Sequence, residues 1–120
     1  MIHAGTKEHP ITIQPIAGRV RVVWRGQKIG ETAHALELAE SGYKPVAYIP
    51  RGDVDMRFLD RTDRVTTCPY KGEANYFSIR DSDAHDNNAV WTYERPKDEV
   101  GAIAGHLAFY PNRVEIVRIA

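Results

Sequence analysis

The chain has 120 residues, and 42% of them are hydrophobic, which suffices for one buried core but not for two independently stable domains. Its 16 Lys and Arg residues balance 16 Asp and Glu residues, and this zero net charge disfavours nucleic acid or an anionic membrane as a partner. No apolar run of membrane-spanning length and no signal peptide are evident, so we expect one cytoplasmic domain over residues 1–120.

Most segments of the first half have the pattern of strands. Ile11–Gln14 alternates apolar and polar residues, and Arg19–Arg25 alternates arginines with valines and a tryptophan, which is typical of a strand with one buried face. Gly26 favours a hairpin turn to a partner strand over residues 28–31. A further strand is predicted over Lys44–Ile49.

One short helix is predicted between these strands, over Thr32–Ser41. Thr32 is a suitable N-cap, residues 33–40 are good helix formers, and Gly42 follows where the helix would end. A single weak helical turn is also predicted over residues 98–105.

The second half predicts two hairpins. Residues 73–80 and 89–93 are rich in strand formers and flank a polar stretch, which indicates a long hairpin with a loose tip. Residues 106–110 and 114–119 flank a Pro-Asn-Arg turn and predict a terminal hairpin. The fold class is therefore mainly β, an antiparallel sheet system curled into a small β-barrel or β-tent with one short helix.

Bulky residues at inward strand positions form the predicted core. They are Val20, Val22, Trp24, Phe77, Trp91 and Phe109. Trp91, with Tyr76, Phe77 and Tyr93, could instead stack on a flat ligand, because aromatic faces bind rings with little further demand on sequence.

The densest polar chemistry lies near the middle of the chain. If a strand has begun at Lys71, then Lys71 and Glu73 project from the same face and could hold a polar or anionic small molecule; the alternative is an exposed ion pair. Asp53 would reach the same place from the preceding segment. The candidate ligand-binding residues are Asp53, Cys68, Tyr70, Lys71, Glu73 and Tyr76.

Cys68 is the single cysteine, which excludes an internal disulfide and fits a reducing compartment. With Lys71 three residues away, it could act as a nucleophile. A cysteine beside a proline is more often a small buried apolar residue, so both interpretations stay open.

The block Thr67–Tyr76 resembles the signature of a bacterial family catalogued as domain of unknown function 427. Further segments follow in the family's order, at 48–54, 90–93 and 108–111. The resemblance implies a small β fold of barrel or tent shape with no established biochemical role.

The family also carries a nucleotidyltransferase-like label. Such chemistry needs adjacent carboxylates for divalent cations, and Asp53 with Asp55, or Asp81 with Asp83, has suitable spacing. Aspartates two apart are also common in turns, and the usual phosphate-holding Gly-Ser segment is absent. The five histidines lack the paired spacing of a zinc site, so neither a metal nor another cofactor is predicted.

Two functions therefore stay open. One is a small-molecule site, with or without catalysis, around the central block; the other is a non-catalytic module that binds another protein. A concave pocket lined by the block favours the first, and a flat apolar patch away from it favours the second. The oligomeric state also stays open.

Overall fold

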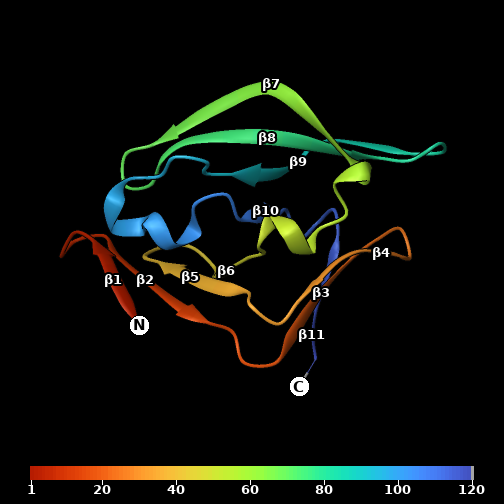
Figure 1. Ribbon diagram of the computed structural model, residues 1–120. Helices are drawn as coiled ribbons and strands as arrows, with labels where there is room; N and C mark the ends of the chain where they lie inside the picture. The colour runs from red at the N-terminus through yellow and green to blue at the C-terminus, as the bar shows by residue number, and fades with distance from the viewer. Residues whose placement is uncertain (120) are drawn as a thin grey trace.

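The computed structural model describes residues 1–119 and is mainly β, with strands arranged in three antiparallel sheets (Figure 1). The first sheet has the strand order β1 (Ile2–Gly5), β2 (Pro10–Pro15), β5 (Leu36–Glu40), β6 (Val46–Tyr48). The second sheet has the order β10 (Leu107–Phe109), β9 (His85–Thr92), β8 (Gly72–Arg80), β7 (Leu59–Cys68). The third sheet has the order β11 (Glu115–Ile119), β3 (Arg19–Trp24), β4 (Gln27–Thr32). The predicted mainly β, antiparallel fold class is confirmed. Within residues 1–119 the sheets are separate rather than one closed barrel.

The helices of the described chain are short 3₁₀ segments, and none is long and apolar enough to cross a membrane. They are η1 (Arg51–Asp53), η2 (Met56–Phe58) and η3 (Asp98–Ile103). The last of these lies where the weak helical turn was predicted.

The helix predicted over Thr32–Ser41 is wrong. Thr32 ends β4, and β5 begins four residues later and pairs with β2 on one side and β6 on the other. Leu38, opposite Ile13, is only 1% exposed. Two flanking strands satisfy the backbone of this segment, and the strand conformation buries Leu38, which together outweigh the local helix propensity.

The hairpins over β3–β4 and β8–β9 are confirmed, and β9 begins earlier than predicted, at His85. The terminal hairpin is wrong, because β10 pairs with β9 whereas β11 pairs with β3. Backbone hydrogen bonds between Ile49 and Leu107 occupy the other edge of β10. The chain therefore turns after β10 and joins the third sheet.

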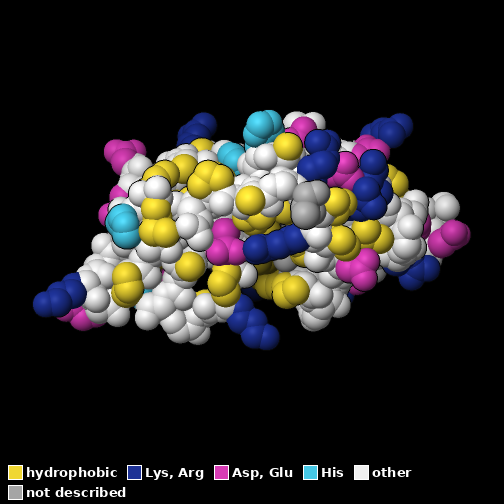
Figure 2. Space-filling model, turned by 90° about the horizontal axis from the view of Figure 1, so that it is seen from below, with side chains coloured by type: hydrophobic (Ala, Val, Ile, Leu, Met, Phe, Trp, Pro, Cys, Tyr) yellow, Lys and Arg dark blue, Asp and Glu magenta, His cyan; other side chains and the backbone are white. Residues whose placement is uncertain are grey.

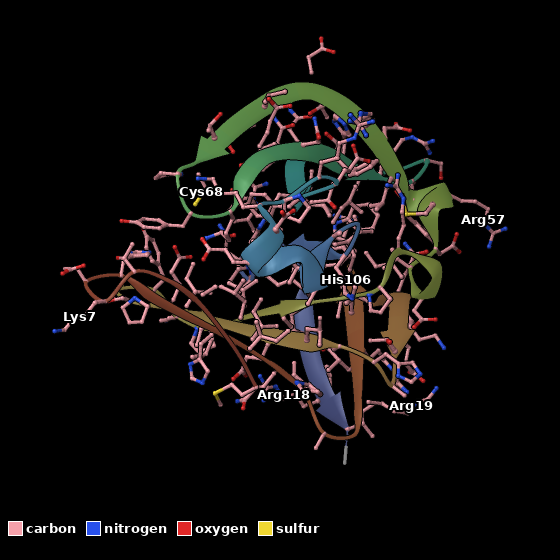
Figure 3. The ribbon with its side chains drawn as sticks, turned by 60° about the vertical axis from the view of Figure 1, so that its left-hand side comes forward. Lys7, Arg19, Arg57, Cys68, His106 and Arg118 are labelled. Carbon is pink, nitrogen blue, oxygen red and sulfur yellow. The ribbon has the colours of Figure 1, made fainter. Side chains whose placement is uncertain are left out.

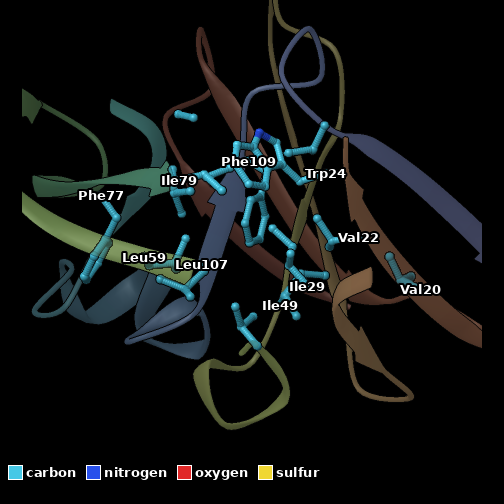
Figure 4. Packing of buried hydrophobic residues seen from close by; sticks show 14 of the residues in the cluster. Val20, Val22, Trp24, Ile29, Ile49, Leu59, Phe77, Ile79, Leu107 and Phe109 are labelled. Atoms are coloured by element: carbon cyan, nitrogen blue, oxygen red, sulfur yellow. The ribbon is translucent and has the colours of Figure 1, made fainter. Parts of the chain in front are cut away.

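The buried side chains form two clusters. One surrounds Trp24 and joins the second and third sheets (Figure 4). The other lies where the first and second sheets face each other. Five of the six predicted core residues are buried, whereas Trp91 is partly exposed.

The two faces of the second sheet serve different clusters. Phe77 and its cross-strand partner Val90 belong to the cluster around Trp24. Tyr76 and its partner Trp91, one residue away on each strand, belong to the other cluster. The two-residue period of a strand thus directs an aromatic face toward the first sheet.

Candidate functional site

A pocket of about 350 Å³ opens between the first and second sheets. Its aromatic lining consists of Tyr43, Tyr48, Tyr76, Trp91, Tyr93 and Tyr110. Its charged lining consists of Glu40, Lys44 and Lys71, and Cys68 also lies on its wall. The pocket therefore combines flat apolar surfaces with a small number of charges, as ligand sites commonly do.

Strand periodicity explains why these side chains meet. Leu38 and Glu40 are two apart on β5, and Val46 and Tyr48 are two apart on β6, so each pair points to one face of the first sheet. The opposite wall comes from the aromatic face of the second sheet, including Trp91. Both sheets are needed to enclose the pocket.

The aromatic side chains hold one another in place. The indole nitrogen of Trp91 donates a hydrogen bond to the Tyr48 hydroxyl at 3.3 Å, and the two rings meet edge-on with centroids 6.5 Å apart. Trp91 also packs on Tyr110, with centroids 4.6 Å apart. Such packing fixes the aromatic wall before any ligand arrives.

Lys71 is buried beside the pocket and bound to a carboxylate. It occupies the turn between β7 and β8, where Gly72 takes a φ of +112° that favours glycine. Its ammonium donates to the carboxylate of Glu40, which also binds Nε2 of His9 at 2.6 Å. The imidazole of His9 in turn stacks on Tyr70, with centroids 4.1 Å apart.

Two electrostatic effects follow from this burial. Burial alone would raise the pKa of Glu40, but hydrogen bonds from Lys71 and His9 outweigh it and hold that pKa below its usual value. Burial raises the pKa of both Tyr48 and Tyr93, so their phenols stay protonated at neutral pH. The pocket thus presents a carboxylate, ammonium groups and neutral hydroxyls.

The structure brings together three of the six predicted site residues. Cys68, Lys71 and Tyr76 line the pocket. Tyr70 does not line it but contacts His9 behind the buried ion pair. Glu73 is exposed on β8 and lies an odd number of residues from Tyr76, so it faces away. The expectation that Lys71 and Glu73 share a face, as a ligand grip or an exposed ion pair, is wrong, because Lys71 is buried and its partner is Glu40.

Asp53 lies outside the pocket and supports the backbone. Its carboxylate accepts a hydrogen bond from the Thr32 hydroxyl at 2.7 Å, which links η1 to the end of β4. The same hydroxyl accepts from the backbone N–H of His34. Asp55 caps η2 by accepting from the backbone N–H of Arg57.

The second aspartate pair also shapes a turn. Asp81 accepts hydrogen bonds from the backbone N–H groups of Asp83 and Ala84, each at 2.8 Å. Within residues 1–119, no group of three His, Cys, Asp or Glu side chains is arranged to hold a metal ion. The residues present therefore do not fit the divalent-cation site that a nucleotidyltransferase label implies.

Sequence reasoning missed Glu40, Lys44, Tyr48 and Tyr110. Glu40 was hidden within the wrongly predicted helix, although Leu38 and Glu40 already show the two-residue spacing of a strand. The other three lie within predicted strands. Tyr48 and Tyr110 also belong to the segments that resemble the family, but that resemblance assigns them no role.

The family described as domain of unknown function (DUF427) matches residues 12–119, and this range contains every residue that lines the pocket. It excludes His9, the second partner of Glu40. No curated protein matches the chain. A match over nearly the whole sequence shows that the chain belongs to the family of domain of unknown function 427.

Proposed function

We propose that the protein binds a small, flat molecule carrying one anionic group in the pocket between the first and second sheets. The observation that carries this proposal is the lining itself, six aromatic side chains with two lysines and one glutamate. Aromatic faces bind planar rings, and the excess positive charge favours an anion.

Lys44 is the lysine available to that anion. Lys71 already donates to Glu40 and is 7% exposed, whereas Lys44 is exposed at the pocket and has no carboxylate within ion-pair distance among residues 1–119. A ligand ring would then lie against Trp91 and Tyr110, with its anionic group toward Lys44 at the mouth.

The alternative, a protein-binding module, has weaker support. The large hydrophobic residues that are exposed include Ile2 on β1 and Val65 on β7, strands that belong to different sheets (Figure 1). On the underside, hydrophobic side chains are interspersed with basic and acidic ones (Figure 2). The face seen in Figure 2 therefore does not favour one broad apolar patch over the pocket.

We also propose that the protein works in the bacterial cytoplasm, and that its first two sheets form the slopes of a β-tent over the ligand. The single cysteine is free and lines the ligand site, where a reducing compartment would keep it as a thiol. Nucleotidyl transfer is not proposed, because the aspartates that it would need make structural hydrogen bonds, Asp53 with Thr32 and Asp81 with the backbone of Asp83.

Isothermal titration calorimetry with 8-anilinonaphthalene-1-sulfonate, salicylate and pyridoxal 5′-phosphate tests this function. Each probe joins a flat ring system to an anionic group. We expect at least one to bind, and Lys44→Met to weaken that binding about tenfold through loss of a charge-assisted contact.

Lys28→Met is the matched control, because Lys28 is exposed on β4 and does not line the pocket. Fluorescence provides a second readout, since Trp91 lines the pocket whereas Trp24 is fully buried in the other cluster. A Trp91→Phe protein should lose any quenching that the bound probe causes. Absence of binding by all three probes, or equal weakening by Lys28→Met, would contradict the proposal.

A further inference from the structure

Cys68 is placed where a bound molecule could reach it. It is the last residue of β7, is partly exposed, and lies on the pocket wall (Figure 3). Because the chain has one cysteine, any covalent adduct on a thiol identifies this position. A thiol alone does not define a site, and the neighbouring tyrosine supplies the second observation.

Tyr93 lines the same pocket and is 6% exposed, yet no residue in the described part of the chain hydrogen-bonds its hydroxyl. Among the described residues every fully buried side-chain oxygen has a partner, so the unpartnered Tyr93 hydroxyl must be accessible from the pocket. Burial, followed by the charges of neighbouring acidic groups that include Cys68, raises the pKa of Tyr93. Its O–H is therefore a permanent donor at neutral pH and faces the space that a ligand would fill.

We propose that Cys68 adds covalently to planar α,β-unsaturated carbonyl compounds bound in this pocket, while the Tyr93 hydroxyl donates a hydrogen bond to the carbonyl oxygen. This inference rests on the proposed function, because the aromatic walls must first hold the compound. It adds to that function a reactive group and a class of electrophile.

The step balances without another reactant. The thiol releases its proton to solvent, and the thiolate sulfur forms a bond to the β-carbon of the conjugated system. The electron pair of the carbon–carbon double bond shifts so that negative charge reaches the carbonyl oxygen, where the Tyr93 O–H stabilises it. Water then protonates the α-carbon and leaves a saturated thioether.

The pocket favours this class over other partners of a thiol. Alkyl halides and disulfides develop no charge on a carbonyl oxygen, so the Tyr93 hydroxyl would contribute nothing to their reaction. Planar conjugated carbonyl compounds use both the aromatic walls and the unpartnered donor. The prediction is therefore a difference between electrophiles and not merely reactivity of Cys68.

Second-order rate constants for N-phenylmaleimide and iodoacetamide, measured by intact-protein mass spectrometry, test the proposal. N-phenylmaleimide carries a ring and a conjugated carbonyl, whereas iodoacetamide reacts by displacement. We expect Tyr93→Phe to slow the first reaction about tenfold, the value of one hydrogen bond of about 1.4 kcal/mol, and to leave the second unchanged. Tyr70→Phe is the matched control, since Tyr70 does not line the pocket, and Cys68→Ser should abolish both adducts.

The outcomes separate this inference from the proposed function. If the three anionic probes fail to bind and none protects Cys68 from iodoacetamide, both proposals fall. If a probe binds and protects Cys68 but Tyr93→Phe reacts with N-phenylmaleimide at the parent rate, the ligand pocket stands and the covalent role is overturned. A tenfold loss in both reactions would also overturn it, because the tyrosine would then act on the thiol and not on the carbonyl.

Discussion

The ammonium of Lys71 binds the carboxylate of Glu40, 31 positions earlier in the chain, and only 9% and 10% of their side-chain surfaces are exposed. The pair connects the β7–β8 turn to β5, so it joins the second sheet to the first beside the pocket. Two buried charges compensate each other here, and the removal of either leaves the other without its main partner.

We expect Lys71→Met to lower the free energy of unfolding by about 3 to 5 kcal/mol, because Glu40 would keep only its contact with His9. Urea unfolding followed by circular dichroism measures the change. The double variant Lys71→Met/Glu40→Leu should recover part of the loss, since it removes both charges. A single variant as stable as the parent would show that the pair is solvated.

The same pair makes stability depend on pH. The pKa of Glu40 in the folded protein lies below 4.5, its ordinary value, so the folded state binds this proton more weakly than the unfolded chain does. Its contribution is therefore complete above about pH 4.5 and declines as the pH falls through the lowered folded-state pKa. Glu40→Gln should flatten this part of the curve of unfolding free energy against pH, whereas Glu73→Gln, an exposed change on β8, should preserve it.

The two tryptophans should differ in their importance for stability. Trp24 is fully buried and its indole donates to Asp86 at 2.8 Å, whereas Trp91 is partly exposed at the pocket. We expect Trp24→Ala to cost about 3 to 5 kcal/mol and Trp91→Ala clearly less. Thermal unfolding of both variants tests this order, and the reverse order would place the main core on the other side of the second sheet.

Asp53 should matter for stability and not for binding. Its hydrogen bond from Thr32 predicts that Asp53→Ala, which removes the acceptor, lowers the free energy of unfolding by about 1 kcal/mol and leaves probe affinity unchanged. Chemical denaturation and calorimetry on the same protein separate the two effects. Weaker probe binding at unchanged stability would show that Asp53 contributes to ligand binding after all.

Local sequence sufficed for strands with a clear alternation or with several strand-forming residues in a row. Residues 19–25 alternate and residues 73–80 are rich in strand formers, so both strands, and the burial of Trp24 and Phe77, could be predicted. The segment over 36–40 is short and made of helix formers, and its strand conformation depends on two partners elsewhere in the chain.

The candidate site shows the same division between local and distant information. Cys68, Lys71 and Tyr76 lie within one short block, so their common location was predictable. The period of a strand would also have excluded Glu73, which lies three residues from Tyr76. No local pattern could have paired Lys71 with Glu40, because only the contact between two sheets brings them together.

Two backbone hydrogen bonds, at 2.8 and 2.7 Å, join Ile49, the residue after β6, to Leu107 on β10. They connect the two walls of the pocket along one edge. The walls therefore cannot separate along that line without breaking backbone hydrogen bonds between two fully buried residues. Any opening motion of the pocket must therefore pivot about the Ile49–Leu107 hydrogen bonds and widen the opposite side, near Lys44 and Tyr43. Amide hydrogen exchange at Ile49 and Leu107 should accordingly be among the slowest in the molecule, while the mouth exchanges freely.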